Sequence, residues 1–317
     1  MKFFSLASAA FILTLAMGAS AAPAPAQPSP FYFADPFESL RLQDQRVAAV
    51  SFALRRAIRD SCSSRTLDLG WTLHNARQYA PKVRQRAQDH FRLRGGLPSV
   101  LAIAARGPAA RGGLLIDDVV VAINGKPIEA AAPYGPADPA PLKRQIAMID
   151  AALGEVALVD VLREGAEVRV RIDPERICAF RSSVEPSAEL QANSNADDVS
   201  ITSGMARFAR TDDELAFLLA HEYAHIILGH NAAGNIDASG ARSIGFEFDA
   251  DRLALSLTQR SGYRIDGVVA LFERLGRARP LLEILPSGHP TLGRRRAALR
   301  AEIERLGKSG SRTPGRS

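Results

Sequence analysis

The helix predicted over residues 212 to about 230 constrains this chain more than any other feature. It is apolar on nearly every face, so it is expected to be buried. Thr211 and Glu214 form a capping box that predicts where this helix begins. The same segment carries two histidines and a further glutamate, and a buried helix does not admit such groups without compensation.

A bound metal ion would supply that compensation, and the spacing of these three side chains allows them to act at one ion. His221 and His225 are four residues apart, lie on one helix face, and can both direct a ring nitrogen at one metal ion. Glu222 projects about 100° away around the helix, where it can hold a metal-bound water and take its proton. The pattern His-Glu-x-x-His therefore predicts a hydrolytic metal site.

A hydrolytic zinc site needs a third protein ligand and an open fourth position. A second predicted helix, residues 243–258, contains Glu247 and Asp251, which are four residues apart and share a face. We assign Glu247 as the third ligand and Asp251 as the group that orients a ligand histidine. His230 lies near the motif but off the ligand face, and we interpret it as a helix-end histidine.

From about residue 190 to residue 306 the sequence resembles the zinc endopeptidase family that includes HtpX, the CAAX prenyl proteases and periplasmic quality-control peptidases. The strongest parts are residues 214–225 and 247–252. Residues 193–204 resemble the family's strand that pairs with substrate backbone, although Ser194 departs from the usual alanine.

The resemblance extends to His289-Pro290 and the later Arg295. It implies that His289 stabilises the oxyanion of the tetrahedral intermediate, with Arg295 as a supporting residue behind the ligands. The alternative interpretation of this segment is a helix cap, in which Thr291 opens the last amphipathic helix.

A different pattern occupies the middle of the chain, where residues 94–174 read as strands rather than helices. Residues 107–125 resemble the sequence pattern of bacterial PDZ domains, with Asp117-Asp118 where the family has Gly-Asp.

This resemblance implies a groove between a strand and the helix predicted over residues 142–153. An extended peptide would add to that strand, and the loop containing Gly95, Gly96 and Leu97 would supply the backbone N–H groups that hold it. The alternative is a small β-domain used only for packing.

The start of the chain predicts export. A basic start, an apolar run over residues 3–17 and small residues before Ala21 form a signal peptide cleaved near Ala21; an uncleaved anchor is the alternative. No other stretch is apolar enough to cross a bilayer, so we expect no stable membrane insertion and a periplasmic or secreted protein. In that oxidising space Cys62 and Cys178 predict a disulfide, with two buried thiols as the alternative.

Composition excludes other functions. The chain has 317 residues and a formal net charge of +6, but its basic run at residues 294–296 has no interleaved aromatic residues, so no nucleic-acid partner is expected.

The predicted organisation is a signal peptide over 1–21, a linker over 22–34, an N-terminal helical region over 35–93, a PDZ-like domain over 94–175, a metallopeptidase domain over 176–307 and a disordered tail over 308–317.

The sequence thus predicts an α+β fold: a mainly helical zincin-type metallopeptidase domain with a small edge sheet, plus a β-rich PDZ-like domain. It predicts a metalloendopeptidase with one Zn²⁺ per chain that acts on polypeptides, such as misfolded envelope proteins, captured by the PDZ-like module. The alternative is a periplasmic chaperone or adaptor whose metal site is structural or latent. No oligomeric state is predicted.

Overall fold

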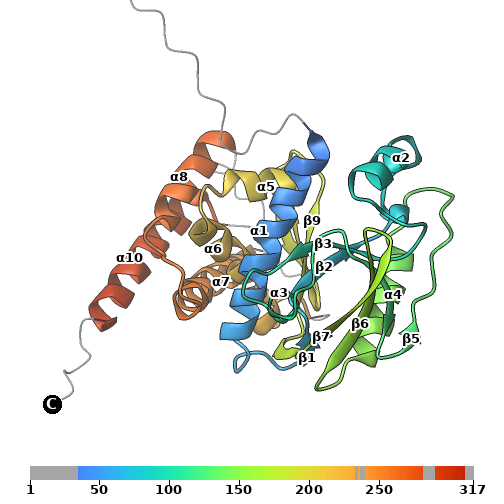
Figure 1. Ribbon diagram of the computed structural model, residues 1–317. Helices are drawn as coiled ribbons and strands as arrows, with labels where there is room; N and C mark the ends of the chain where they lie inside the picture. The colour runs from blue at the N-terminus through green and yellow to red at the C-terminus, as the bar shows by residue number, and fades with distance from the viewer. Residues whose placement is uncertain (1–34, 233–234, 236–239, 281–289, 311–317) are drawn as a thin grey trace, which may run out of the picture. The chain divides into compact units, whose positions relative to one another are not determined.

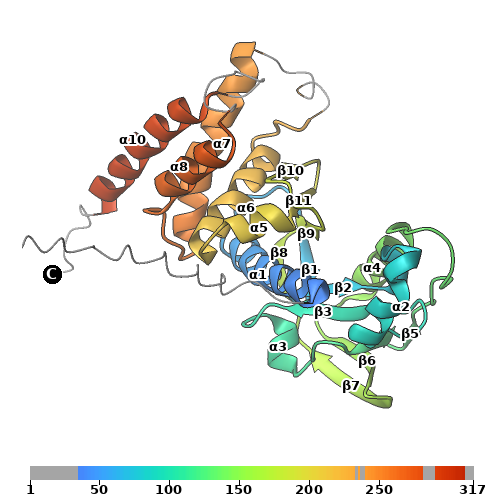
Figure 2. The same ribbon diagram turned by 90° about the horizontal axis from the view of Figure 1, so that it is seen from above.

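The computed structural model describes residues 35–232, 235, 240–280 and 290–310 (Figures 1 and 2). The predicted signal peptide, the whole predicted linker, most of the predicted tail and His289 lie outside the described residues. None of the described helices is both long and apolar enough to span a bilayer.

Helices and strands follow one another along the chain in a mixed order. The helices are α1 (Pro36–Ala57), the short 3-10 helix η1 (Ala76–Gln78), α2 (Pro81–His90), α3 (Pro108–Gly112), α4 (Ala140–Ala152), α5 (Ser203–Phe208), α6 (Asp212–Ile227), α7 (Gly240–Arg260), α8 (Val268–Ala278) and α10 (Leu292–Gly310). The strands are β1 (Arg65–Asp68), β2 (Trp71–His74), β3 (Ser99–Ile103), β4 (Val119–Ile123), β5 (Lys126–Pro127), β6 (Ala157–Arg163), β7 (Ala166–Ile172), β8 (Glu175–Cys178), β9 (Arg181–Glu185), β10 (Ala192–Ser194) and β11 (Asp198–Thr202). The predicted α+β fold class is confirmed.

The larger sheet has the strand order β2-β3-β4-β6-β7, with β5 paired to β4, and all its pairs are antiparallel. Its core includes Val100 and Val159 from the sheet and Ile149 from α4. Leu73 of β2 joins the same core, although β2 lies within residues 35–93, which were assigned to a separate N-terminal region. The sheet therefore begins earlier in the chain than the predicted boundary at residue 94.

The turn before β4 forms without the glycine usual in the PDZ pattern. Asp117 adopts the left-handed conformation with φ 69°, which aspartate tolerates better than most residues. Its carboxylate lies 3.1 Å from the guanidinium of Arg41 in α1. The buried Asp118 accepts two hydrogen bonds from Arg163, at 2.9 and 2.7 Å, and one from the Leu115 N–H. The substitution at 117 thus keeps the turn and adds an ion pair.

The second core surrounds α6, whose buried residues include Phe217 and Tyr223. Leu54 of α1 and Leu255 of α7 pack into this core, and α8 and α10 lie together on the same part of the structure (Figure 1). A three-stranded sheet of order β10-β11-β9 leaves β10 at its edge, beside α6 (Figure 2).

Polar contacts join α1 to β3 of the larger sheet and to β1 of the two-stranded sheet that β1 forms with β8. The Ile103 N–H of β3 donates to the Gln45 side-chain oxygen at 3.0 Å, and the Gln45 amide donates to the Ile103 carbonyl oxygen. Arg55 pairs with Asp68 at 2.8 Å. The same helix therefore buries one face in the α6 core and binds the end of β3.

A disulfide joins Cys62, which follows α1, to Cys178 at the end of β8, with the Cα atoms 5.9 Å apart. The bridge closes a segment of 116 residues that contains the whole larger sheet. Cross-links over long segments restrict the unfolded chain and so favour the folded state.

Candidate active site

The helix α6 begins where the capping pattern predicts. Thr211 accepts a hydrogen bond from the Glu214 N–H at 3.2 Å, which satisfies one of the free donors of the first turn. The Glu214 carboxylate accepts from the Arg210 N–H at 2.8 Å and pairs with Arg274 at 2.6 Å. Within this helix His221 and His225 share one face, because they are four residues apart.

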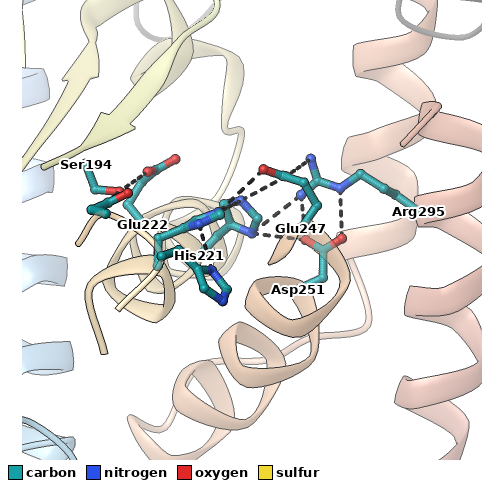
Figure 3. Close-up of polar contacts among 9 residues, drawn as sticks. Ser194, His221, Glu222, Glu247, Asp251 and Arg295 are labelled. Carbon is teal, nitrogen blue, oxygen red and sulfur yellow. Dashed lines mark hydrogen bonds and ion pairs between the residues drawn. The ribbon is translucent and has the colours of Figure 1, made fainter. Parts of the chain in front are cut away.

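Three predicted ligands converge on one point between α6 and α7 (Figure 3). The Nε2 atoms of His221 and His225 are 3.1 Å apart. The Glu247 carboxylate oxygens lie 3.5 Å from His221 Nε2 and 3.6 Å from His225 Nε2. In a tetrahedral zinc site the donor atoms lie roughly 3.3 Å from one another. Both the chemistry and the spacing of these donors therefore fit a zinc ion.

Asp251 stands behind His221, where the sequence placed a group that orients a ligand. Its Oδ1 is 3.1 Å from His221 Nδ1, and Arg295 of α10 donates to both carboxylate oxygens, at 2.8 and 2.6 Å. A further Arg295 nitrogen lies 3.1 Å from the Glu247 carboxylate. Arg295 therefore contacts both carboxylates of the site from a third helix.

The charges around His221 explain its protonation behaviour. Burial by itself lowers the pKa of His221, but hydrogen bonds to Asp251 and Glu247 raise it, with a net pKa of about 9. Burial by itself raises the pKa of Asp251, but the Arg295 charge and its hydrogen bond lower it below its usual range. The pKa of His225 is lowered to about 3, by burial and then by the charge of His221. The Arg295 charge therefore favours the charged form of Asp251 in spite of its burial.

Glu222 points away from this ligand face toward β10 (Figure 3). The Ser194 hydroxyl donates to Glu222 Oε2 at 2.8 Å, and the Asn231 amide donates to the Ser194 oxygen at 3.1 Å. Burial raises the pKa of Glu222. The sequence did not assign Ser194 or Asn231 to the site, and the only signal was that Ser194 departs from the family's alanine.

A cavity of about 460 Å³ opens over these residues. The β10 edge forms one wall, Phe272 and Leu275 of α8 form another, and the ligands line its floor. Pro290 also lines the cavity, directly after His289, whose predicted oxyanion role stays a prediction because it lies outside the described residues.

The predicted peptide-holding loop at Gly95, Gly96 and Leu97 needs a correction. This loop leads into β3, which pairs with β2 on one side and β4 on the other, so no peptide can add beside it. The Leu97 N–H donates to the Arg94 carbonyl, and the Gly96 carbonyl accepts from Ala131 and Gln145. The outer strands of this sheet are β2 and β7, and β2, the neighbour of β3, lies in the stretch that the sequence had assigned to another region.

His230 follows the end of α6, as its interpretation as a helix-end histidine predicted, and its ring also contacts a predicted ligand. Its Nδ1 lies 3.1 Å from Nδ1 of the predicted ligand His225. It is only 8% exposed, and burial lowers its pKa. Helical periodicity could not reveal this contact, because His230 follows the end of α6.

Comparisons with protein families identify two parts of the chain. The PDZ domain family matches residues 99–138, and peptidase family M48 matches residues 174–244. The second match includes the His-Glu-x-x-His helix. The chain therefore contains a segment that matches the M48 peptidase family and a segment that matches the PDZ domain family, and the predicted resemblances to both families are confirmed.

Solved structures similar to this chain include an HtrA-type protease, AlgW, with a decapeptide, at 22% identity and a TM-score of 0.26. That match covers 35% of this chain and 30% of AlgW. Another is the HtrA3 PDZ domain bound to a phage-derived ligand, at 19% identity and a TM-score of 0.25, covering 36% of this chain and 90% of that domain. The chain thus spans less than a third of the AlgW chain. Curated proteins show no significant match.

Proposed function

We propose that this protein is a zinc-dependent metalloendopeptidase that hydrolyses peptide bonds within polypeptides. The observation that carries the proposal is the convergence of His221, His225 and Glu247 on one point. Glu222 lies next to this point on α6, the helix of the two histidines. One Zn²⁺ per chain would be held by these three side chains. When bound, the ion supplies Lewis-acid polarisation of water and of the scissile carbonyl group.

Glu222 performs the proton transfers of the reaction. Its Oε2 accepts the Ser194 hydrogen bond, which leaves Oε1 to take a proton from the attacking water. As the new C–O bond forms and the C–N bond breaks, Glu222 returns that proton to the leaving amine nitrogen. The resemblance adds His289 as the donor to the oxyanion.

The β10 edge supports the choice of a polypeptide substrate. A strand with a free edge can pair with the backbone of an extended chain, and β10 lies along the cavity. Such pairing binds main-chain groups regardless of side chain and holds the substrate extended beside Glu222.

The PDZ domain and the compartment complete the proposal. The PDZ domain captures or positions polypeptides, such as misfolded envelope proteins, before cleavage. Export after cleavage near Ala21 places the protein in the periplasm or outside the cell, and the Cys62–Cys178 disulfide supports an oxidising compartment.

The test compares the purified parent with Glu222→Gln on casein, with Glu304→Gln, an exposed glutamate of α10, as the matched control. We expect Glu222→Gln to keep zinc and to lose cleavage by roughly 10²–10⁴-fold, since the proton acceptor is gone. Chelation should abolish cleavage by the parent and added Zn²⁺ should restore it. Equal cleavage of casein by the parent and by Glu222→Gln would reject the role of Glu222. Less than about half an equivalent of zinc in the parent would favour the adaptor alternative.

A further inference from the structure

The chain reverses direction directly after α6 and brings His230 back to the motif. Gly229 adopts the left-handed conformation with φ 67°, which glycine reaches without strain. The His230 N–H then donates to the His225 carbonyl oxygen at 2.9 Å. Both the backbone and the ring of His230 therefore contact His225.

The contacts of the His225 ring show which of its two nitrogens can bind a metal. Nε2 of His225 faces His221 and Glu247, so it is the nitrogen that can bind a metal. Its lone pair must then be free, which puts the proton on Nδ1. That Nδ1–H points at Nδ1 of His230, 3.1 Å away, so His230 is the acceptor and carries its own proton on Nε2.

The His230 ring also contacts helix α7. The His230 ring stacks on Phe246, with ring centroids 4.1 Å apart and planes 12° from parallel. Phe246 immediately precedes the ligand Glu247, and the Arg242 guanidinium lies 5.5 Å from the centre of the Phe246 ring. One side chain thus contacts a ligand on α6 and the neighbour of a ligand on α7.

The two ligand histidines consequently have different partners. His221 Nδ1 faces the carboxylate of Asp251, whereas His225 Nδ1 faces an imidazole. A group that accepts a hydrogen bond from the other ring N–H of a ligand histidine fixes the tautomer and orientation of the ring and strengthens metal binding.

We propose that His230 is a positioning residue for the metal: it orients His225 by accepting a hydrogen bond from its Nδ1–H and joins α6 to α7 through Phe246. The proposal rests on the proposed function only in that the metal belongs to it. Two substitutions separate the contacts. His230→Phe keeps a ring to stack on Phe246 and removes the acceptor, whereas His230→Asn places an amide oxygen at the same bond position as Nδ1 and removes the ring.

The experiment measures the dissociation constant of Zn²⁺ by competition with a chromogenic chelator, for the parent and both variants of the full chain. His90→Phe, which removes a histidine distant from the ligands in sequence, is the control. We expect His230→Phe to bind zinc roughly 10–100-fold more weakly, His230→Asn to remain closer to the parent, and the control to match the parent. Circular dichroism of the zinc-free proteins checks that each is folded, and His230→Asn carries the test if His230→Phe is not.

Parent-like zinc affinity in His230→Phe overturns the inference while the proposed function stands. Binding by His230→Asn that is as weak as in His230→Phe, or weaker, also overturns it, because packing rather than the acceptor would then matter. A parent that binds no zinc overturns both proposals.

Discussion

The candidate metal site and the junction of α1 with β2 each contain a buried aspartate and a buried histidine, and the two pairs behave in opposite ways. At the site, Asp251 has a lowered pKa because the Arg295 charge outweighs burial. At the junction, burial raises the pKa of Asp44 to about 8. Equal burial thus produces a charged carboxylate in one place and favours a neutral carboxyl in the other.

The histidines show the same contrast. The pKa of His221 is about 9, since the hydrogen bonds to Asp251 and Glu247 outweigh burial, whereas that of His74 is lowered to about 3 by burial and by the charge of Arg41. His74 Nδ1 lies 2.8 Å from the neutral Tyr79 hydroxyl. The neighbours rather than burial decide which region can hold a cation.

Removing Arg295 should have the largest effect, because it would leave the buried carboxylates of Asp251 and Glu247 without the guanidinium that contacts both. Arg295→Met is expected to lower the free energy of unfolding by about 3–5 kcal/mol, measured by denaturant titration of the zinc-free protein. Arg300→Met on the same helix, whose side chain is 59% exposed, should cost less than about 1 kcal/mol. Parent-like stability of Arg295→Met would contradict the charge balance drawn for the site.

The substitution Asp44→Asn tests the raised pKa of Asp44 at the junction of α1 with β2. Between its unfolded pKa near 3.8 and its folded pKa of about 8, the folded state holds a proton that the unfolded state has released, so stability falls as pH rises through this window. From pH 5 to pH 7 the parent should lose about 3 kcal/mol more than Asp44→Asn, at about 1.4 kcal/mol per pH unit. Denaturant titrations at both pH values measure this difference. Parallel pH dependence of parent and variant would disprove it, and Asp60→Asn, an exposed aspartate, should follow the parent.

Gln145 tests whether the PDZ domain's buried polar groups serve only its fold. Its amide donates to the Gly96 and Glu129 carbonyl oxygens, each at 2.8 Å, and accepts from Asn75 at 2.9 Å. Gln145→Leu should destabilise the chain by about 1–3 kcal/mol in denaturant titration, since these groups lose their partners. Cleavage of a short peptide per folded molecule should stay unchanged, with the exposed Gln85→Leu as control. A matching drop in that cleavage would show that the two regions are coupled.

Ser194 should give the smallest effect. Ser194→Ala removes the donor to Glu222, so we expect kcat to fall roughly fivefold, equivalent to about 1 kcal/mol, with KM nearly unchanged. Ser194→Thr keeps a hydroxyl and should recover most of kcat, and the exposed Ser183→Ala should match the parent. If Ser194→Ala retains full kcat, the hydroxyl does not help to hold Glu222.

The sequence by itself determined the features that depend on local periodicity. Residues four apart on a helix share a face, so the pairs His221 with His225 and Glu247 with Asp251 could be read without a fold. The structure brings both pairs together at one point. The PDZ pattern and the α+β class follow from similarly local signals.

Tertiary structure alone decided which distant groups meet. Strand order places β2, and not the strand after the loop at Gly96, at this outer edge of the PDZ sheet, because β3 is paired on both sides. The contact of Ser194 with Glu222 spans 28 residues, and that of Arg295 with Asp251 spans 44. His230 reaches His225 only through the reversal at Gly229. Protonation follows the same rule, because the energy of a buried charge depends on neighbours that packing, not spacing in the sequence, brings to it.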